Sequence, residues 1–561
     1  MLRMDKFHYM SAIDEIAERY VTSFAERNPA MATVVGITGY DHLMTDLSPA
    51  GMDALADLDR TTVAELTKTA ASDEHEQVTK DAMLERMTTA LELYDSGTTA
   101  SELNVISSWV QGIRQLFDLM PTEGERAQRD LAARMAAVPA AYDGLRQTYV
   151  LAAARGHVAA RRQVAACAKQ CAEWSASGKD YYSALVERTQ ATGAIRADLD
   201  RAAEAATAAT AEFGAFLEAE LLPIARERDA VGREQYALAA RAFLGARIDL
   251  DEAYAWGWAE VLRIETEMRG LARQIVPGGK LADALAALDA DPARKIVGRE
   301  ALRHWMQDLA DTTISELDGT HFDIPEPARR IECLIAPTSD GGIYYTNPSE
   351  DWSRPGRVWW ALDENLDEFS TWKEVTTIYH EGVPGHHLQI AQTVYLRDQL
   401  NRWQRMLCWV SGHGEGWALY AERLMDELGY LADPGNKLGM LDAQLLRAAR
   451  VVVDIGVHLE LAIPADSPWH PGETWNAGLA WEFLRSRVQM DEAMLRFELD
   501  RYLGWPGQAP SYKLGERIWL QARDEARARK GAAFDLKEFH SQALALGSVG
   551  LDPLRAALAR L

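Results

Sequence analysis

The sequence predicts a mainly α-helical fold with one small β-sheet. Up to about Asp318 the chain is rich in Ala, Leu, Arg and Glu, and its apolar residues recur at intervals of three and four, the spacing of amphipathic helices. Between Thr320 and Leu362 the composition changes to clusters of β-branched and aromatic residues separated by Gly and Pro, which is typical of short strands and turns. Helical periodicity then returns and continues to the C-terminus.

The composition indicates a folded protein and argues against two classes of binding partner. Of 561 residues 48% are apolar, and 84 acidic against 59 basic residues give a net charge of −25. This apolar fraction is too high for a disordered chain, and the acidic balance argues against nucleic acids and anionic membranes as partners. No stretch of eighteen apolar residues and no secretory signal pattern is present, so we expect a cytoplasmic location. Four cysteines are too few for a disulfide scaffold, and we expect reduced thiols.

Gly and Pro punctuate the helical segments. Breaks fall at Asn28-Pro29, at Met120-Pro121 and at Pro277-Gly278-Gly279. None of these connections is long or low in complexity, so they predict helix connections rather than domain linkers. In the C-terminal part, irregular stretches are expected at Pro464–Pro471 and Gly504–Pro510.

The predicted sheet lies in the segment IECLIAPTSDGGIYYTNPSEDWSRPGRVWWAL, which begins at Ile331. Asp340-Gly341-Gly342 and Arg354-Pro355-Gly356 separate its apolar runs. We expect a few short strands joined by turns at these positions.

The helix expected after the sheet carries the strongest candidates for metal-binding and catalytic residues. Thr371 and Glu374 form a T-x-x-E pattern, so we expect a capping box and a helix that starts near Trp372. His380 and Glu381 lie on this largely apolar helix, where burying them is costly unless a partner satisfies them. The pair also begins the H-E-x-x-H zinc signature, in which two histidines share a helix face and the glutamate acts as base.

The second histidine of that signature is displaced. Position i+4 from His380 is Pro384, and the next histidines are His386 and His387. Pro384 cannot donate the helical hydrogen bond, so the helix must bulge or kink there. If Val383-Pro384-Gly385 is taken as a two-residue insertion, His386 is the second ligand, and we prefer this pairing. His387 returns to nearly the same face about 10.5 Å along the axis. It is the alternative ligand, or a group that supports a ligand or binds substrate.

The segment SGHGEGWALYAERL supplies the third ligand. Glu415 lies among three glycines that permit close approach of the backbone to another element, and Glu422 follows seven residues later on the same helix face. We expect one of them to be a ligand and the other to anchor a ligand. For Glu422 a structural salt bridge is an equal alternative, and His413 either supports the site or lies in a solvated loop.

The motifs HEGVPGHHLQ, EGWALYAE and PGQAPSYKLGE together resemble a bacterial family catalogued as domain of unknown function 885. The resemblance covers nearly the whole chain. That family's fold is similar to carboxypeptidase Taq and, more distantly, to angiotensin-converting enzyme. Those enzymes are mostly helical, with a deep channel, a short sheet beside the zinc helix and a Glu as third ligand. The Glu415–Glu422 spacing and the stretch Pro510–Gly515 match the Taq pattern, whereas the Pro-Gly insertion in the metal motif departs from it.

The resemblance implies a zinc-dependent hydrolytic site. His380, His386 and Glu415 would hold one Zn²⁺, and Glu381 would act as general base. Tyr512 would donate a hydrogen bond to the developing oxyanion, with a core tyrosine as the alternative.

Three further polar residues are candidates for substrate binding. His458 lies four residues after Asp454 on one helix face, either as a carboxylate-oriented group that helps bind substrate or as a core histidine. Arg447 and Arg450 either hold a substrate carboxylate bidentately or pair with the abundant acidic residues.

The expected function is that of a zinc metallohydrolase, a peptidase or carboxypeptidase that acts on short peptides. The alternatives are a zinc-dependent amide hydrolase for a small non-peptide metabolite, and a non-catalytic helical binding protein with a decayed site. Residues 1–318 would form a helical scaffold and part of the channel, and residues 319–561 the catalytic part, as one continuous unit. The expected partner is a short peptide or small amide, with a homodimer as one option for assembly.

Overall fold

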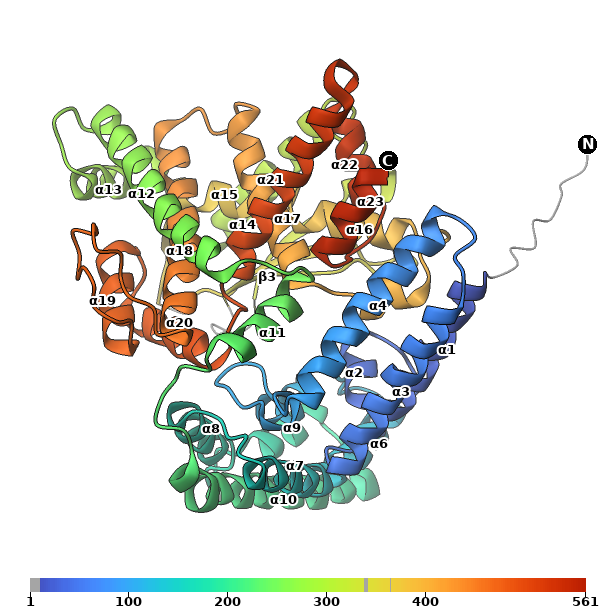
Figure 1. Cartoon of the computed structure of the whole chain (residues 1–561). Helices are drawn as coiled ribbons and strands as arrows, with labels where there is room; N and C mark the ends of the chain where they lie inside the picture. The colour runs from blue at the N-terminus through green and yellow to red at the C-terminus, as the bar shows by residue number, and fades with distance from the viewer. Residues whose placement is uncertain (1–10, 337–341, 364, 561) are drawn as a thin grey trace, which may run out of the picture. The chain divides into compact units, whose positions relative to one another are not determined.

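The computed structural model describes residues 11–336, 342–363 and 365–560, and these residues are mainly helical, as predicted (Figure 1). The chain divides into two compact units. The first comprises Met1–Ala239, Val457–Leu461 and Arg496–Pro506, and the second comprises Ala240–Gly456, Ala462–Leu495 and Gly507–Leu561. The boundary expected after residue 318 therefore falls inside the second unit. Within the described residues, no helix combines the length and apolar character needed to cross a membrane.

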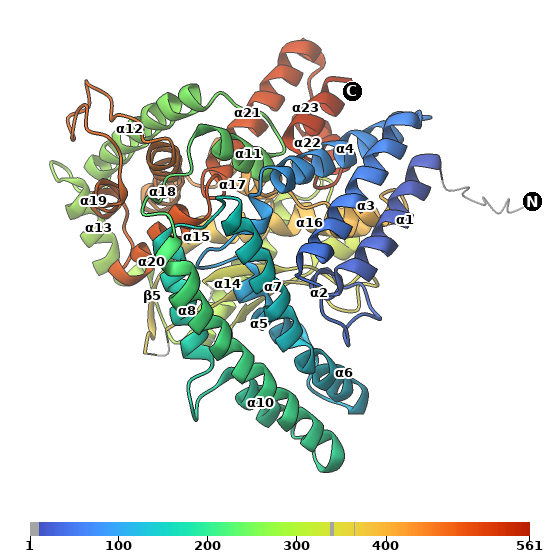
Figure 2. The ribbon, with the colours of Figure 1, turned by 60° about the horizontal axis from the view of Figure 1, so that its bottom comes forward.

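Four other α-helices of the first unit pack against helix α10 (Gly193–Phe216), which Figure 2 shows at the lower end of the view. Tyr142 stacks on Phe213 in its core with ring centroids 4.7 Å apart. Cys167 and Cys171 are free and buried in the same core, as expected of reduced thiols. The other α-helices wholly inside this unit are α1 (Ala12–Arg27), α2 (Pro29–Val34), α3 (Pro49–Lys68), α4 (Glu74–Asp95), α5 (Trp109–Gln115), α6 (Glu125–Ala136), α7 (Val138–Ala154), α8 (Arg161–Trp174) and α9 (Tyr181–Thr189).

The second unit contains the predicted sheet and the predicted site. Trp417, Trp519 and Tyr420 form an aromatic core whose indole rings lie 5.1 Å apart. Its α-helices are α12 (Leu250–Ile275), α13 (Leu281–Ala290), α14 (Arg299–Leu317), α15 (Thr371–Glu381), α16 (His386–Tyr395), α17 (Ser411–Glu427), α19 (Ala477–Arg487), α21 (Ser511–Lys530), α22 (Leu536–Leu544) and α23 (Leu551–Arg560). Three helices run through a unit boundary: α11 (Arg233–Leu244), α18 (Pro434–His458) and α20 (Glu492–Gly504).

The predicted strands form a three-stranded sheet in the order β2-β4-β3. β2 (Ile331–Ile335) is parallel to β4 (Gly356–Trp360), and β3 (Ile343–Thr346) is antiparallel to β4. The turn expected at Asp340-Gly341 lies outside the described residues. A second sheet, in which β1 (Lys295–Val297) pairs with β5 (Glu368–Ser370), was not predicted, because three-residue strands carry too little alternation to be recognised.

Helix α15 begins at Thr371, close to the expected position, but the predicted capping box is wrong. Ser370 occupies the N-cap position, and Thr371 Oγ1 donates to the Arg294 carbonyl at 3.1 Å. Glu374 is turned to the sheet, where it accepts the Trp360 indole N–H at 3.3 Å. Tertiary contacts therefore take both side chains away from the helix end.

Candidate metal centre

The helix that carries His380 stops rather than kinks. α15 ends at Glu381, and α16 begins at His386 after a four-residue turn. Within this turn Gly385 donates its N–H to the Tyr379 carbonyl at 3.0 Å. A Cβ at Gly385 would lie 1.9 Å from the His380 carbonyl oxygen, so a side chain there cannot be accommodated without moving the backbone. The Val-Pro-Gly insertion is thus a compact turn that ends one helix and starts another.

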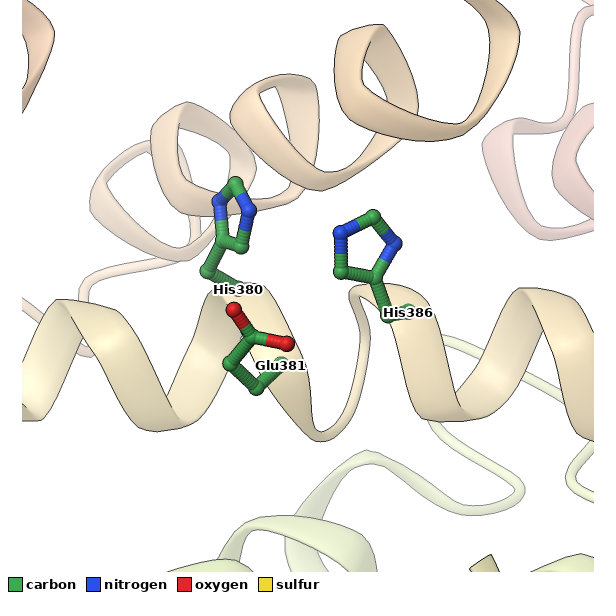
Figure 3. A group of neighbouring side chains, drawn as sticks. All are labelled: His380, Glu381 and His386. Carbon is green, nitrogen blue, oxygen red and sulfur yellow. The ribbon is translucent and has the colours of Figure 1, made fainter. Parts of the chain in front are cut away.

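This turn brings two histidines and one glutamate together. The imidazole rings of His380 and His386 have centroids 4.9 Å apart and planes at 90°. Glu381 lies beside them, and metal-ligand atoms of all three side chains lie within 4.8 Å of one another (Figure 3). All three residues are buried.

Glu415 from α17 reaches the same point. Its Oε2 atom lies 3.5 Å from His380 Nε2 and 3.4 Å from His386 Nε2. Ligand atoms at bond lengths of 2.0–2.1 Å around a tetrahedral zinc ion are about 3.4 Å apart. The donor set of two imidazoles and one carboxylate is also that of a zinc site which keeps one position open. The two distances from Glu415 therefore match the spacing of ligand atoms that share one metal ion.

Glu422 lies behind His380. Its Oε1 atom is 2.7 Å from His380 Nδ1, while Nε2 of the same ring faces Glu415. Glu422 is nearly completely buried. The structure thus places Glu415 and Glu422 at the two nitrogens of one imidazole, the arrangement of a ligand carboxylate and an anchoring carboxylate.

The site brings together two buried carboxylates, Glu381 and Glu422, and the partly buried Glu415, and this determines its electrostatics. Burial lowers the pKa of His380, but its contacts with Glu415 and Glu422 outweigh burial and raise that pKa to about 10. Burial would raise the pKa of Glu415, yet contacts with the two histidines hold it well below its usual range, and Glu422 is lowered in the same way. Burial dominates at Glu381 and raises its pKa. Glu381 is therefore the carboxylate of the cluster that most readily takes a proton.

Helices α17 and α21 position Glu415 and Tyr512 through contact between their backbones. A Cβ on Gly416 would lie 2.4 Å from the Gly515 carbonyl carbon, and a Cβ on Gly515 would lie 2.1 Å from the Gly412 carbonyl oxygen. The glycines of the two motifs therefore face one another. Tyr512 occupies the first turn of α21, and the Arg450 guanidinium covers its ring at 4.9 Å.

The structure keeps His387 out of the cluster. Its Nδ1 atom lies 2.8 Å from the Tyr345 hydroxyl and its Nε2 atom 2.8 Å from the Ala328 carbonyl oxygen. The ring is completely buried, and burial lowers its pKa to about 4. Both nitrogens are engaged in joining α16 to the sheet region.

Two other predicted histidines have structural partners. His413 is buried with Nδ1 2.8 Å from the Val549 carbonyl oxygen, so it does not lie in a solvated loop. His458 belongs to the first unit, where Nε2 lies 2.9 Å from the Tyr502 carbonyl oxygen. Asp454 Oδ2 accepts the Gly507 N–H at 2.8 Å.

Sequence reasoning missed three buried residues that support the site. Trp417 donates its indole N–H to the Pro384 carbonyl. Gln444 donates to Glu422, and Lys513 donates to Gln444. Trp417 and Lys513 lie inside quoted motifs, next to predicted site residues, but their partners are distant in sequence. Arg447 lies one turn beyond Gln444 on α18, and no ion pair joins it to a carboxylate within the described residues.

The model of one protein family, described as bacterial protein of unknown function (DUF885), matches residues 29–558. The chain belongs to this family. The match covers the sheet, the helix break and both glutamate-bearing turns of α17, so the site described above is part of the DUF885 domain. The curated proteins contain no match to the chain.

Solved structures with this fold cover nearly the whole chain. One, described as a "putative lipoprotein" from Colwellia psychrerythraea, has a TM-score of 0.81 and 22% identity over 98% of this chain and 99% of that one. Another, described as a "putative lipoprotein of unknown function" from Shewanella oneidensis, has a TM-score of 0.76 and 17% identity over 98% and 100%. These likenesses show the fold, and the cytoplasmic location stays a prediction.

Proposed function

We propose that this DUF885 protein is a zinc-dependent hydrolase of short peptides, with a fold and site related to the carboxypeptidase Taq type. The observation that carries the proposal is the convergence of His380 Nε2, His386 Nε2 and Glu415 Oε2, with separations of 3.4 and 3.5 Å. Three carboxylates lie around two imidazoles, and two of them, Glu381 and Glu422, are buried. This also favours a divalent cation, because buried charge needs compensation.

A bound zinc ion would supply a Lewis acid and lower the pKa of water at the open position. Glu381 accepts the proton of the attacking water and delivers it to the leaving amine. Burial raises the pKa of Glu381, which favours uptake of this proton. Glu422 holds His380 in place, and Tyr512 donates a hydrogen bond to the oxygen on which charge develops.

The test is hydrolysis of a mixed library of short peptides by the zinc-loaded protein and by Glu381→Gln. Gln keeps the size of the side chain but cannot accept the proton, so we expect retained zinc and a rate at least about 10²-fold lower. If the zinc-loaded wild-type protein leaves peptides of every length intact, the proposed peptidase activity is contradicted. Cleavage of other small amides under the same conditions would favour the amide hydrolase instead.

A further inference from the structure

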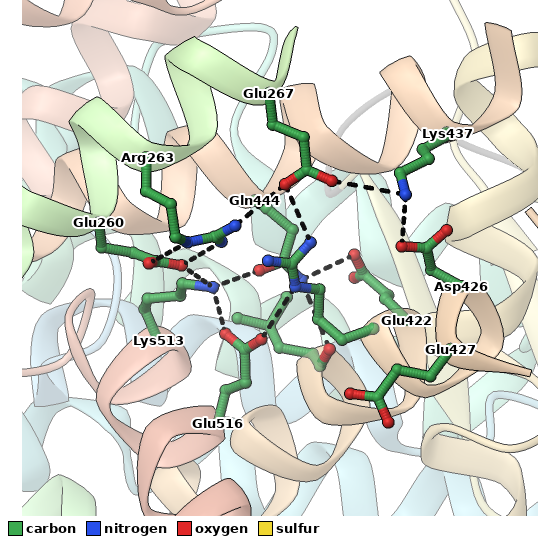
Figure 4. A network of polar contacts seen from close by, with 12 residues as sticks. Glu260, Arg263, Glu267, Glu422, Asp426, Glu427, Lys437, Gln444, Lys513 and Glu516 are labelled. Carbon is green, nitrogen blue, oxygen red and sulfur yellow. Dashed lines mark hydrogen bonds and ion pairs between the residues drawn. The ribbon is translucent and has the colours of Figure 1, made fainter. Parts of the chain in front are cut away.

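A buried chain of polar side chains continues behind His380. Glu422 Oε2 accepts a hydrogen bond from Gln444 Nε2 at 3.2 Å, and Gln444 Oε1 accepts one from the Lys513 ammonium (Figure 4). The members come from the four helices α15, α17, α18 and α21, and all of these residues lie in the second unit. Glu422, Gln444 and Lys513 are each at most 1% exposed. Water therefore does not replace these contacts.

The chemistry of Lys513 fixes the direction of every bond in this chain. An ammonium group has only donors, so it must face the oxygen of the Gln444 amide. The amide NH₂ group then points to Glu422, whose ionised carboxylate has only acceptors. Gln444 also directs this NH₂ group to the Leu419 carbonyl oxygen at 3.4 Å. A reversed amide would place two donors together on one side and two acceptors on the other.

The same direction extends to His380. Because Glu422 accepts, His380 Nδ1 must carry the hydrogen of their 2.7 Å contact. In the neutral ring that a metal ligand requires, the lone pair then resides on Nε2, the atom that lies 3.5 Å from Glu415 Oε2. A histidine binds a metal only through a nitrogen that carries no proton.

We propose that Lys513 and Gln444 are positioning residues of the metal site, which fix the Nδ1–H tautomer of His380 through Glu422. The inference rests on the proposed zinc site and deepens it. Lys513 holds its place because it also pairs with Glu516 and, at 3.1 Å, with Glu260.

The chain offers a matched control for this role. Lys437 belongs to the same network (Figure 4), where it pairs with Asp426 at 2.8 Å and with Glu267 at 3.5 Å. It does not contact Gln444 or Glu422 within the described residues. Removing the charge of Lys437 therefore tests how much the network contributes to stability, and it leaves the hydrogen bonds between Lys513, Gln444, Glu422 and His380 intact.

The experiment measures zinc affinity by competition with a chelating dye, and urea unfolding of the chelated protein, for Lys513→Met, Gln444→Met and Lys437→Met. We expect the first two to weaken zinc binding about 10- to 100-fold and Lys437→Met to change it less than about twofold. Lys513→Arg, whose guanidinium also only donates, should retain more affinity than Lys513→Met. If Lys513→Met fails to fold, the neutral and similarly sized change at Gln444 carries the test.

The outcomes separate the two proposals. Wild-type affinity for zinc in folded Gln444→Met overturns the positioning role and leaves the zinc site intact. A fall in affinity that merely parallels loss of stability, and that Lys437→Met reproduces, also overturns it. Zinc binding without hydrolysis overturns only the proposed function, whereas a wild-type protein that binds no zinc overturns both.

Discussion

Trp417 donates its indole N–H to the carbonyl oxygen of Pro384 at 2.9 Å, and the Gly385 carbonyl oxygen lies 3.3 Å from the same nitrogen. Trp417 follows the predicted ligand Glu415 by two residues and is completely buried. One side chain of α17 therefore supports the turn that sets the position of His386. The two segments that carry the proposed metal ligands are therefore joined by this contact.

Removing this donor should affect both stability and the site. Trp417→Phe leaves the Pro384 carbonyl without its partner, which costs about 1–3 kcal/mol of unfolding free energy, and we expect weaker zinc binding because the turn is no longer held. Trp519→Phe is the control, since it removes a similar indole bond, to the His413 carbonyl at 3.0 Å. Urea unfolding and zinc titration of both variants provide the measurement. Equal zinc affinity in the two would refute the role of Trp417.

The glycine contact between α17 and α21 makes a prediction about packing. Gly416→Ala places a Cβ against backbone of Gly515 and should lower the unfolding free energy by about 1–3 kcal/mol. Gly414→Ala meets only the far end of the Trp409 ring, in a residue that is 50% exposed. It should be neutral or gain up to about 1 kcal/mol from helix propensity. Denaturant unfolding measures the unfolding free energy of both variants. A Gly416→Ala protein as stable as the wild type would contradict the close contact between the two helices.

The helices and the three-stranded sheet were predictable because their periodicity and turns are local properties of the sequence. Pro384 also predicted a distortion of the helix, which favoured His386 over residue i+4 as the partner of His380, but the sequence indicated a kink rather than the turn between two helices that is found. The surroundings of His387 could not be predicted in this way. Its partners Tyr345 and Ala328 lie 42 and 59 residues away, and nothing in the sequence distinguishes a ligand from a histidine that joins two elements.

The polar chain behind His380 could not be predicted from the sequence either. Gln444 meets Glu422 and Lys513 across 22 and 69 residues of sequence. A lone Gln or Lys on a helix has no signature for such a role, because the role arises when four helices pack. The capping pattern at Thr371 and Glu374 failed for a related reason, since the folded protein offered both side chains other partners.

Arg447 leads to a prediction about the end of the substrate. It is one turn from Gln444, and its Nε atom has no hydrogen-bond partner within the described residues. Its charge acts on Glu381 and Glu422. We expect Arg447→Gln to raise KM about tenfold or more for peptides with a free terminal carboxylate, and to spare the same peptides as amides. Equal losses on both substrate series would mean that Arg447 only balances the charge of the site.

The burial of His540 predicts that the stability of the fold decreases at acidic pH. It is buried beside the Tyr420 hydroxyl at 2.7 Å, and burial, with the charge of Arg523, lowers its pKa to about 3. The pKa of histidine in the unfolded chain is about 6.5. Between this pH and about 3 the unfolded chain therefore binds more protons than the folded protein, and the unfolding free energy falls as the pH falls. His540→Gln should reduce this slope by up to about 1.4 kcal/mol per pH unit, while His387 and His413 retain theirs. Unfolding free energies measured from pH 7 to pH 4 provide the test, and parallel curves for wild type and variant would contradict it.

The most direct measurement of the central claim is the zinc content of the purified protein and of two variants at neighbouring positions. The account predicts one zinc ion in the wild type, loss of that ion in His386→Ala, and its retention in His387→Gln, where the amide still reaches Tyr345 and Ala328. No stoichiometric zinc in the wild type would contradict the account. So would zinc that survives in His386→Ala and disappears from folded His387→Gln.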